Sequence, residues 1–175
     1  MSGTGHGAQE AYWQQLTTCK IVSCYVRLYR DGQTRWIKWV GIFKAIATSG
    51  TIGAWAVWKE YAFVWGVVLA LAQVIDAIKE YIPQTKGQRA ASEFVQAMEN
   101  LIIDARFEWY SVFNGDLTAS EIMTRWRKLA KLMIEIETKY FPDGLPANQN
   151  RQELAEAEAE RYFAGIYGGG DAGDE

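Results

Sequence analysis

The longest apolar stretch of the chain covers residues 36–83 and consists of two arms around the polar pair Lys59 and Glu60. Each arm, 36–58 and 61–82, has about 20 residues, enough for a helix that crosses a hydrocarbon core of about 30 Å. Aromatic residues mark both edges, as they do at membrane interfaces. These interface anchors are Trp36, Trp39 and Tyr81 at one edge and Trp55, Trp58, Tyr61 and Trp65 at the other. The pattern predicts a transmembrane helical hairpin over 34–83.

Charged residues interrupt both arms and favour an alternative, in which two buried helices belong to a soluble bundle. The uncharged runs around the turn are each only about 15 residues long, which is short for a spanning helix. However, folding the arms about the turn places Lys44 and Asp76 at the same depth. There they would form an intramembrane pair, or Lys44 would extend its amine to the near surface. We therefore expect the membrane hairpin.

Small residues recur at every fourth position of the first arm and continue in the second. Such ridges allow transmembrane helices to pack closely. The predicted ridge consists of Gly41, Ala45, Ser49, Gly53, Gly66 and Ala70. It would join the two arms of one hairpin or join separate protomers. The polar residues Thr48, Ser49 and Gln73 would bond between helices or line a pore in an oligomer.

The rest of the pattern predicts helices outside the membrane and a flexible tail at each end. Residues 1–9 are rich in glycine and read as disordered, and residues 168–175 form an acidic flexible tail. Apolar periodicity predicts a helix over 10–33 that ends at the turn signal Asp31 and Gly32. This helix would pack against the cytosolic bundle or lie on the membrane surface.

The segment 84–167 is predicted to form a cytosolic helical region. One helix covers about 88–113 and stops at Asn114 and Gly115. Thr118 and Glu121 form a capping box that opens the next helix. That helix has an unbroken heptad stripe, Ile122, Trp126, Leu129, Met133, Ile136 and Tyr140. The stripe suits an antiparallel helix pair or an oligomeric coiled coil, and the short turn favours the pair. A last helix covers about 150–167.

Composition and charge refine this picture. The mean hydropathy of −0.16 is too low for a protein made only of membrane spans, so polar segments must flank the hairpin. The formal net charge is −3, but lysine and arginine gather on both sides of the hairpin. The positive-inside rule then predicts a multi-pass protein of the inner membrane with both termini in the cytoplasm. The N-terminal sequence lacks the pattern of a cleavable signal peptide.

Residues with catalytic or metal-binding chemistry are sparse. Cys19 and Cys24 have neither a redox nor a zinc spacing, and we expect buried or lipid-facing thiols. The glutamates of the last helix and the basic stretch Arg125, Arg127, Lys128 and Lys131 are typical of solvated faces. No phosphate-binding loop or catalytic triad occurs. We therefore predict no catalytic residue, metal site or cofactor, no nucleic-acid partner, and a protein that is not an enzyme.

Several motifs together resemble one family. The second arm contains the run Ala-Leu-Ala-Gln over 70–73, and it is followed by Asp-Ala-Arg-Phe-Glu-Trp over 104–109, Gly115, and Lys139 with Tyr140. This arrangement resembles the SLATT family, the SMODS- and SLOG-associating two-transmembrane effectors of bacterial conflict systems. The resemblance implies an anti-phage effector that assembles in the inner membrane and permeabilises it. A sensor or synthase of a nucleotide second messenger would be encoded nearby.

Three functions remain open from the sequence. The first is an oligomeric effector that breaches the lipid bilayer and arrests growth or kills the cell. The second is a membrane-anchored helical scaffold or adaptor that binds a cytosolic partner. The third is a soluble helical regulator. The sequence predicts a homo-oligomer for the first function.

Overall fold

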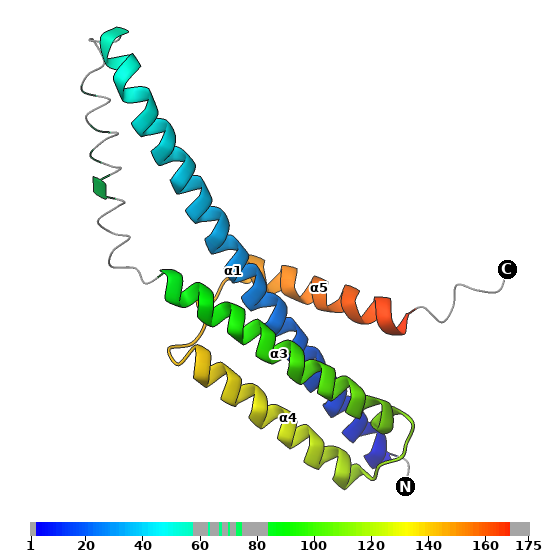
Figure 1. Cartoon of the computed structure of the whole chain (residues 1–175). Helices are drawn as coiled ribbons and strands as arrows, with labels where there is room; N and C mark the ends of the chain where they lie inside the picture. The colour runs from blue at the N-terminus through cyan, green and yellow to red at the C-terminus, as the bar shows by residue number, and fades with distance from the viewer. Residues whose placement is uncertain are drawn as a thin grey trace, which may run out of the picture. The chain divides into compact units, whose positions relative to one another are not determined.

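The computed structural model describes residues 3–57, the positions 63, 67, 70, 73 and 74, and residues 84–168. Within these residues the chain forms helices and no strand (Figure 1). The prediction of an all-α protein is therefore confirmed. The helices are α1 (Gly3–Val57), α3 (Gln84–Phe113), α4 (Ala119–Tyr140) and α5 (Gln149–Tyr167). They divide into a bundle unit, Met1–Tyr29 with Ala90–Glu175, and a second unit, Arg30–Arg89.

The predicted transmembrane hairpin is contradicted. Among the described residues, no helix has both the length and the apolar character that a membrane crossing requires. The multi-pass location in the inner membrane is wrong for the same reason. The prediction counted tryptophan, glycine and small polar residues as part of an apolar arm. These residues add little hydrophobicity, and Lys38 and Lys44 reduce that of the arm in α1 further.

The first part of α1 and α3 run antiparallel in the bundle unit. The Tyr12 hydroxyl donates to the carbonyl oxygen of Ala105 at 3.1 Å, and the Lys20 amine lies 2.8 Å from a carboxylate oxygen of Glu99. Residues later in α1 thus contact residues earlier in α3, so the two helices have opposite directions, as Figure 1 shows. The core between the helices consists of fully buried apolar side chains, which include Tyr12, Leu16, Phe94, Met98 and Ile102.

A short turn joins α3 to α4 and makes these helices antiparallel, as predicted. Gly115 has a φ of +77°, a conformation that glycine adopts without steric cost. The predicted capping box is confirmed, because the Thr118 hydroxyl accepts from the backbone N–H of Glu121 and the Glu121 carboxylate accepts from the backbone N–H of Thr118. The predicted heptad stripe faces the core: Ile122 and Leu129 are buried in it, and the other members pack against it.

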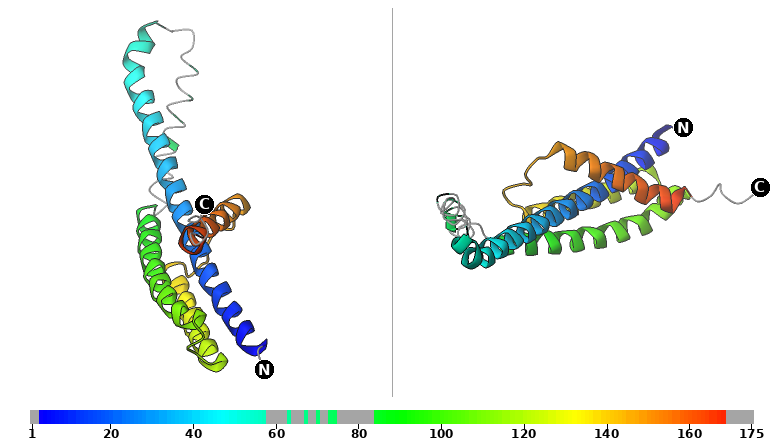
Figure 2. Two further views of the ribbon diagram at one scale, coloured as in Figure 1. Left: turned by 90° about the vertical axis from the view of Figure 1, so that its right-hand side faces the viewer. Right: turned by 90° about the horizontal axis from the view of Figure 1, so that it is seen from above.

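Helix α5 crosses α1 on the side away from α4, as the two views of Figure 2 show. Asn148 caps its N-terminus by accepting from the backbone N–H of Arg151 at 2.9 Å. Ala155, Ala159 and Phe163 form its buried face. The small alanines let α5 approach α1, so that a helix with several glutamates still buries one side.

Two predicted features of the N-terminal region differ from the structure. Helix α1 begins at Gly3, inside the segment predicted to be disordered. It also continues through the predicted turn at Asp31 and Gly32. One glycine costs a helix only about 1 kcal/mol, which the flanking helical residues offset. Local side-chain bonds also support this stretch, because the Thr34 hydroxyl donates to the carbonyl oxygen of Arg30 at 3.0 Å.

Candidate functional site

One cavity of the bundle unit is an aromatic pocket between the start of α1, the end of α3 and the end of α5. It has a volume of about 610 Å³, within the range of small-molecule sites. Most of its wall is aromatic. The lining residues are His6, Gln9, Glu10, Trp13, Arg106, Trp109, Tyr110, Phe113 and Tyr167.

Trp13 fixes the floor of the aromatic pocket. Its ring lies 5.0 Å from that of Trp109, 4.9 Å from that of Phe163 and 5.5 Å from that of Tyr167. Aromatic rings at such separations attract each other through offset and edge-to-face contacts. The three helices are therefore held together at this end by rings, and the pocket is preformed by their packing.

Arg106 is the cation of the aromatic pocket. Its Nη1 donates to the Tyr162 hydroxyl at 2.9 Å, and its Nε is buried without a hydrogen-bond acceptor. Among the described residues, no carboxylate lies within ion-pair distance of its guanidinium. Burial opposes the charge, but interactions with the Tyr167 and Tyr162 hydroxyls raise the pKa of Arg106. The pocket therefore holds a positive charge that forms no ion pair with a carboxylate of the described residues.

A partly buried ion pair lies next to Arg106. The Lys20 amine contacts both carboxylate oxygens of Glu99, at 2.8 and 3.0 Å, and the Ser23 hydroxyl donates to the same carboxylate. The Lys20 amine also lies 4.0 Å from the ring centre of Tyr162. The two cations thus flank one tyrosine, and only Lys20 has an anionic partner.

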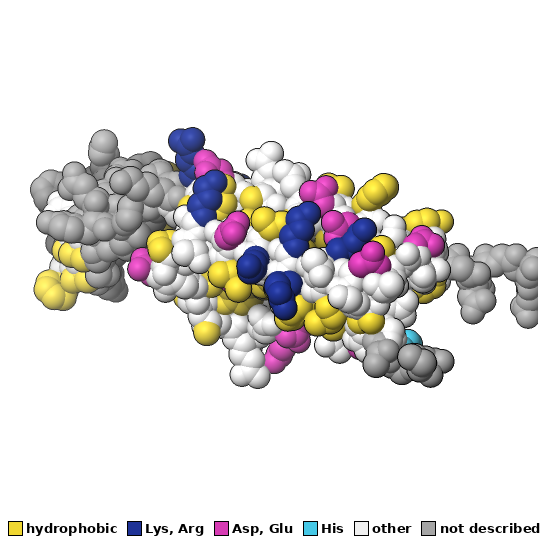
Figure 3. Space-filling model, turned by 90° about the horizontal axis from the view of Figure 1, so that it is seen from below, with side chains coloured by type: hydrophobic (Ala, Val, Ile, Leu, Met, Phe, Trp, Pro, Cys, Tyr) yellow, Lys and Arg dark blue, Asp and Glu magenta, His cyan; other side chains and the backbone are white. Residues whose placement is uncertain are grey.

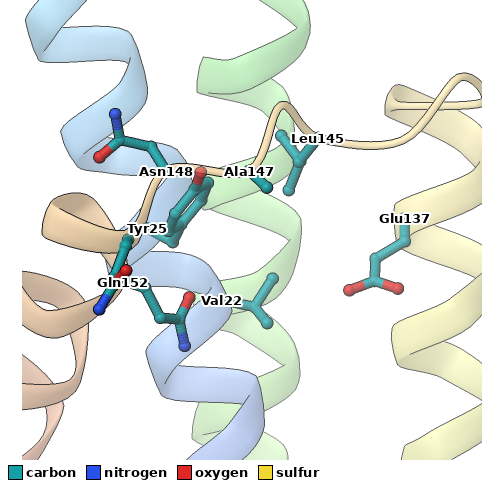
Figure 4. A pocket seen from close by; sticks show the side chains of 8 residues that line it. Val22, Tyr25, Glu137, Leu145, Ala147, Asn148 and Gln152 are labelled. Atoms are coloured by element: carbon teal, nitrogen blue, oxygen red, sulfur yellow. The ribbon is translucent and has the colours of Figure 1, made fainter.

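A second cavity, of about 440 Å³, lies between α1, α4 and the start of α5. Figure 4 shows the Glu137 carboxylate extending from α4 toward this space, with Val22 and Tyr25 opposite on α1. The connection before α5 closes one side, where the Tyr25 hydroxyl donates to the carbonyl oxygen of Pro146. Burial raises the pKa of Glu137, so this cavity disfavours the charge of its own carboxylate.

Glu137→Gln should therefore stabilise the protein at neutral pH. A carboxyl group whose pKa is raised by folding holds its proton more tightly in the folded state. Its contribution to the free energy of unfolding therefore declines as the pH rises from the ordinary glutamate pKa through the raised pKa. Urea unfolding at pH 7 and pH 4 should show that the stabilisation by the substitution shrinks at the lower pH. Glu135→Gln, on the exposed face of α4, is the matched control. Equal effects of both variants at pH 7 would contradict the assignment.

The outer face of α3 carries large apolar side chains that no described helix covers. Ile103 is 59% exposed, Phe107 83% and Tyr110 71%. Their spacing of four and three residues places them in one line, opposite the buried face that contains Met98 and Ala105. We call these three residues the outer stripe. Exposed apolar patches of this kind mark interaction surfaces more often than isolated exposed residues do.

The basic stretch of α4 behaves as a mixed surface. The face in Figure 3 shows lysine and arginine side chains interleaved with acidic and hydrophobic ones, without a continuous positive patch. Lys128 is only loosely paired, with its amine 3.9 Å from the Glu108 carboxylate. This arrangement agrees with the predicted solvated face.

Both cysteines are buried in the bundle unit and form no disulfide. The prediction of buried thiols is confirmed. Burial raises the pKa of the Cys19 thiol to about 11, and it also raises that of Cys24. Both thiols are therefore protonated at neutral pH and poor nucleophiles.

The predicted site residues lie elsewhere, in the second unit. Trp36 and Trp39 are 67% and 68% exposed. Of the small-residue ridge, Gly41 has no atom near enough to touch an added Cβ, and Ala45 and Ala70 are exposed. Gln73 is exposed too. The predicted roles of these positions stay predictions.

The remaining predicted residues cannot be placed at the level of side chains. Lys44, Thr48, Ser49, Gly53 and Trp55 lie in α1, where only the helical backbone is described. The other members lie outside the described residues; they are Trp58, Tyr61, Trp65, Gly66, Asp76 and Tyr81. The pair of Lys44 with Asp76 is therefore untested.

The sequence reasoning missed the aromatic pocket and the outer stripe. The sequence analysis predicts no binding or contact role for Phe107, Tyr110 or Phe113. The available signal was their position: Phe107 and Tyr110 lie away from the buried face of α3, where an exposed helix normally has polar residues. The comparison with protein-family models, curated proteins and solved structures finds no match to this chain. The resemblance to the SLATT family therefore stays a prediction.

Proposed function

We propose that this protein is a non-enzymatic helical scaffold that self-associates through the outer stripe of α3. The observation that supports the proposal most directly is the exposure of Ile103, Phe107 and Tyr110 in one line. A monomer would leave three large apolar side chains in water, at a cost of roughly 25 cal/mol for each Å² of apolar surface. Covering them supplies a driving force for association.

The geometry of the outer stripe favours a second copy of the chain as the occupant. Phe107 lies near the centre of the stripe, with Ile103 before it and Tyr110 after it. In an antiparallel contact between two copies, Phe107 meets its equivalent and Ile103 of each copy meets Tyr110 of the other. Such isologous contacts with two-fold symmetry are the commonest in homo-oligomers. The stripe itself contains no charged residue, so like charges do not meet at its centre.

Sedimentation velocity over a wide concentration range tests this proposal. The wild-type chain should dimerise, and Phe107→Asp should weaken the dimer by about tenfold or more, because it places a charge at the centre of the contact. Ile134→Asp is the matched control, since Ile134 is also a large apolar residue, 60% exposed, but lies on α4. A wild type that stays monomeric, or a Phe107→Asp variant that associates as the wild type does, would overturn the proposal.

The effector function remains untested and is not proposed. Breaching a bilayer requires membrane-spanning helices, and none is found among the described residues. Likewise, a nucleotide-signalling partner rests only on the family resemblance. The proposed scaffold corresponds to the helical adaptor that the sequence predicts, without the membrane anchor.

A further inference from the structure

The aromatic pocket differs from an ordinary gap between helices in its combination of groups. Four of its lining side chains belong to aromatic residues with large exposed or partly exposed rings, Trp109, Tyr110, Phe113 and Tyr167. Flat rings of this kind form stacking contacts with a planar ligand. The pocket lies within the bundle unit, where all three contributing helix segments belong to the same compact body.

The charged residues at the aromatic pocket favour one charge of the ligand over the other. Arg106 has no carboxylate partner among the described residues, and tyrosine hydroxyls alone do not neutralise a guanidinium. Glu10 is the one acidic side chain in the lining; it is exposed and accepts from the Gln14 amide at 2.9 Å. His6 is exposed as well, and the Gln9 amide donates to the carbonyl oxygen of Val112 at 2.9 Å. Arg106 therefore favours an anion in the pocket, and the aromatic walls favour an aromatic ring.

We propose that the aromatic pocket binds a planar aromatic monoanion, such as an aromatic carboxylate, with its ring between Trp109, Phe113 and Tyr167 and its anionic group at Arg106. The ring replaces water along the apolar walls. The anion supplies the charged acceptor that the guanidinium lacks, and hydrogen bonds between charged partners are the stronger ones. Glu10 at the solvent edge disfavours ligands with a second negative charge.

Fluorescence titration of the full chain with 8-anilinonaphthalene-1-sulfonate tests the pocket. This aromatic anion should bind saturably, and Phe113→Ala should weaken binding by about tenfold because it removes one wall. Phe107→Ala is the matched control, because Phe107 is 83% exposed on the outer stripe and does not line the pocket. If Phe107→Ala weakens binding and Phe113→Ala does not, the probe binds the outer stripe and the proposal is overturned.

A competition experiment tests the charge separately. 2-Naphthoate should displace the probe at a concentration about tenfold lower than its neutral isostere 2-naphthamide, because only the carboxylate gains a charged hydrogen bond. Arg106→Gln should abolish this preference. Equal displacement of the probe from the wild type by both compounds would overturn the anionic ligand class, whether or not the variant folds. Because Tyr110 belongs to both the aromatic pocket and the outer stripe, these titrations use a protein concentration below that at which the chain self-associates; Phe107→Asp tests self-association on its own.

Discussion

Phe94→Ala should destabilise the bundle unit by about 3–5 kcal/mol, the largest effect we expect from any single core substitution. Phe94 is fully buried, and its ring makes edge contacts with Tyr140 at 6.3 Å and Phe141 at 5.4 Å. It therefore joins α3 to the end of α4 and to the connection that leads to α5. Alanine would leave a cavity where three segments meet, and helices on both sides limit how far the gap can close.

Urea unfolding followed by circular dichroism measures this loss. Phe107→Ala is the control within the same helix, because it removes an identical side chain that is 83% exposed. We expect a change within about 0.5 kcal/mol for this control. Both variants should be compared at low protein concentration, so that self-association does not contribute to the apparent stability. Similar losses for the two variants would show that α3 does not bury the face described here.

The contrast between these phenylalanines shows what the sequence does predict. Periodicity alone predicted the helix that contains Phe94 and Met98, and the capping box at Thr118 located the start of α4. These signals are local, because a helix face and a helix terminus depend on residues within one or two turns. The antiparallel pairing of α3 with α4 followed from the short turn at Gly115.

Length and aromatic content are weak evidence of a membrane environment. The anchors Trp36 and Trp39 and the glycines of the first arm fit a spanning pattern, but no described helix has the required apolar character. The turn predicted at Gly32 failed because a single glycine is a weak break in a helix with strong flanks.

The aromatic pocket was not predicted from the sequence for a different reason. The aromatic pocket joins Trp13 to Trp109 and Tyr167, which are far apart in the chain and come together only through the packing of α3 against α1 and the crossing of α5 over α1. No local pattern specifies that crossing. Likewise, the sequence does not distinguish Arg106 from an ordinary surface cation. The structure shows that its Nε is buried without an acceptor.

Glu99→Leu should destabilise the protein by about 3 kcal/mol, because it leaves the Lys20 ammonium buried without its anion. The two partners differ in exposure: the side chain of Lys20 is 6% exposed and that of Glu99 is 36%. The expected loss of stability lies near the lower end of the range for breaking a buried ion pair, since the Tyr162 ring at 4.0 Å still attracts the Lys20 amine. Urea unfolding at neutral pH measures the loss.

The asymmetry of this pair predicts which substitution is the more damaging. Lys20→Met leaves a carboxylate that still reaches water and still accepts from Ser23 at 2.8 Å, so it should cost less than Glu99→Leu. The double variant should be more stable than Glu99→Leu alone, because methionine removes the buried charge that the leucine left unpaired. If Lys20→Met proved the costlier change, the pair would contribute mainly through the contact of the amine with Tyr162. In that case Lys20 would be the cation that holds α1, α3 and α5 together. Arg106, which also contacts Tyr162, would be a cation that the bundle unit accommodates without a carboxylate partner.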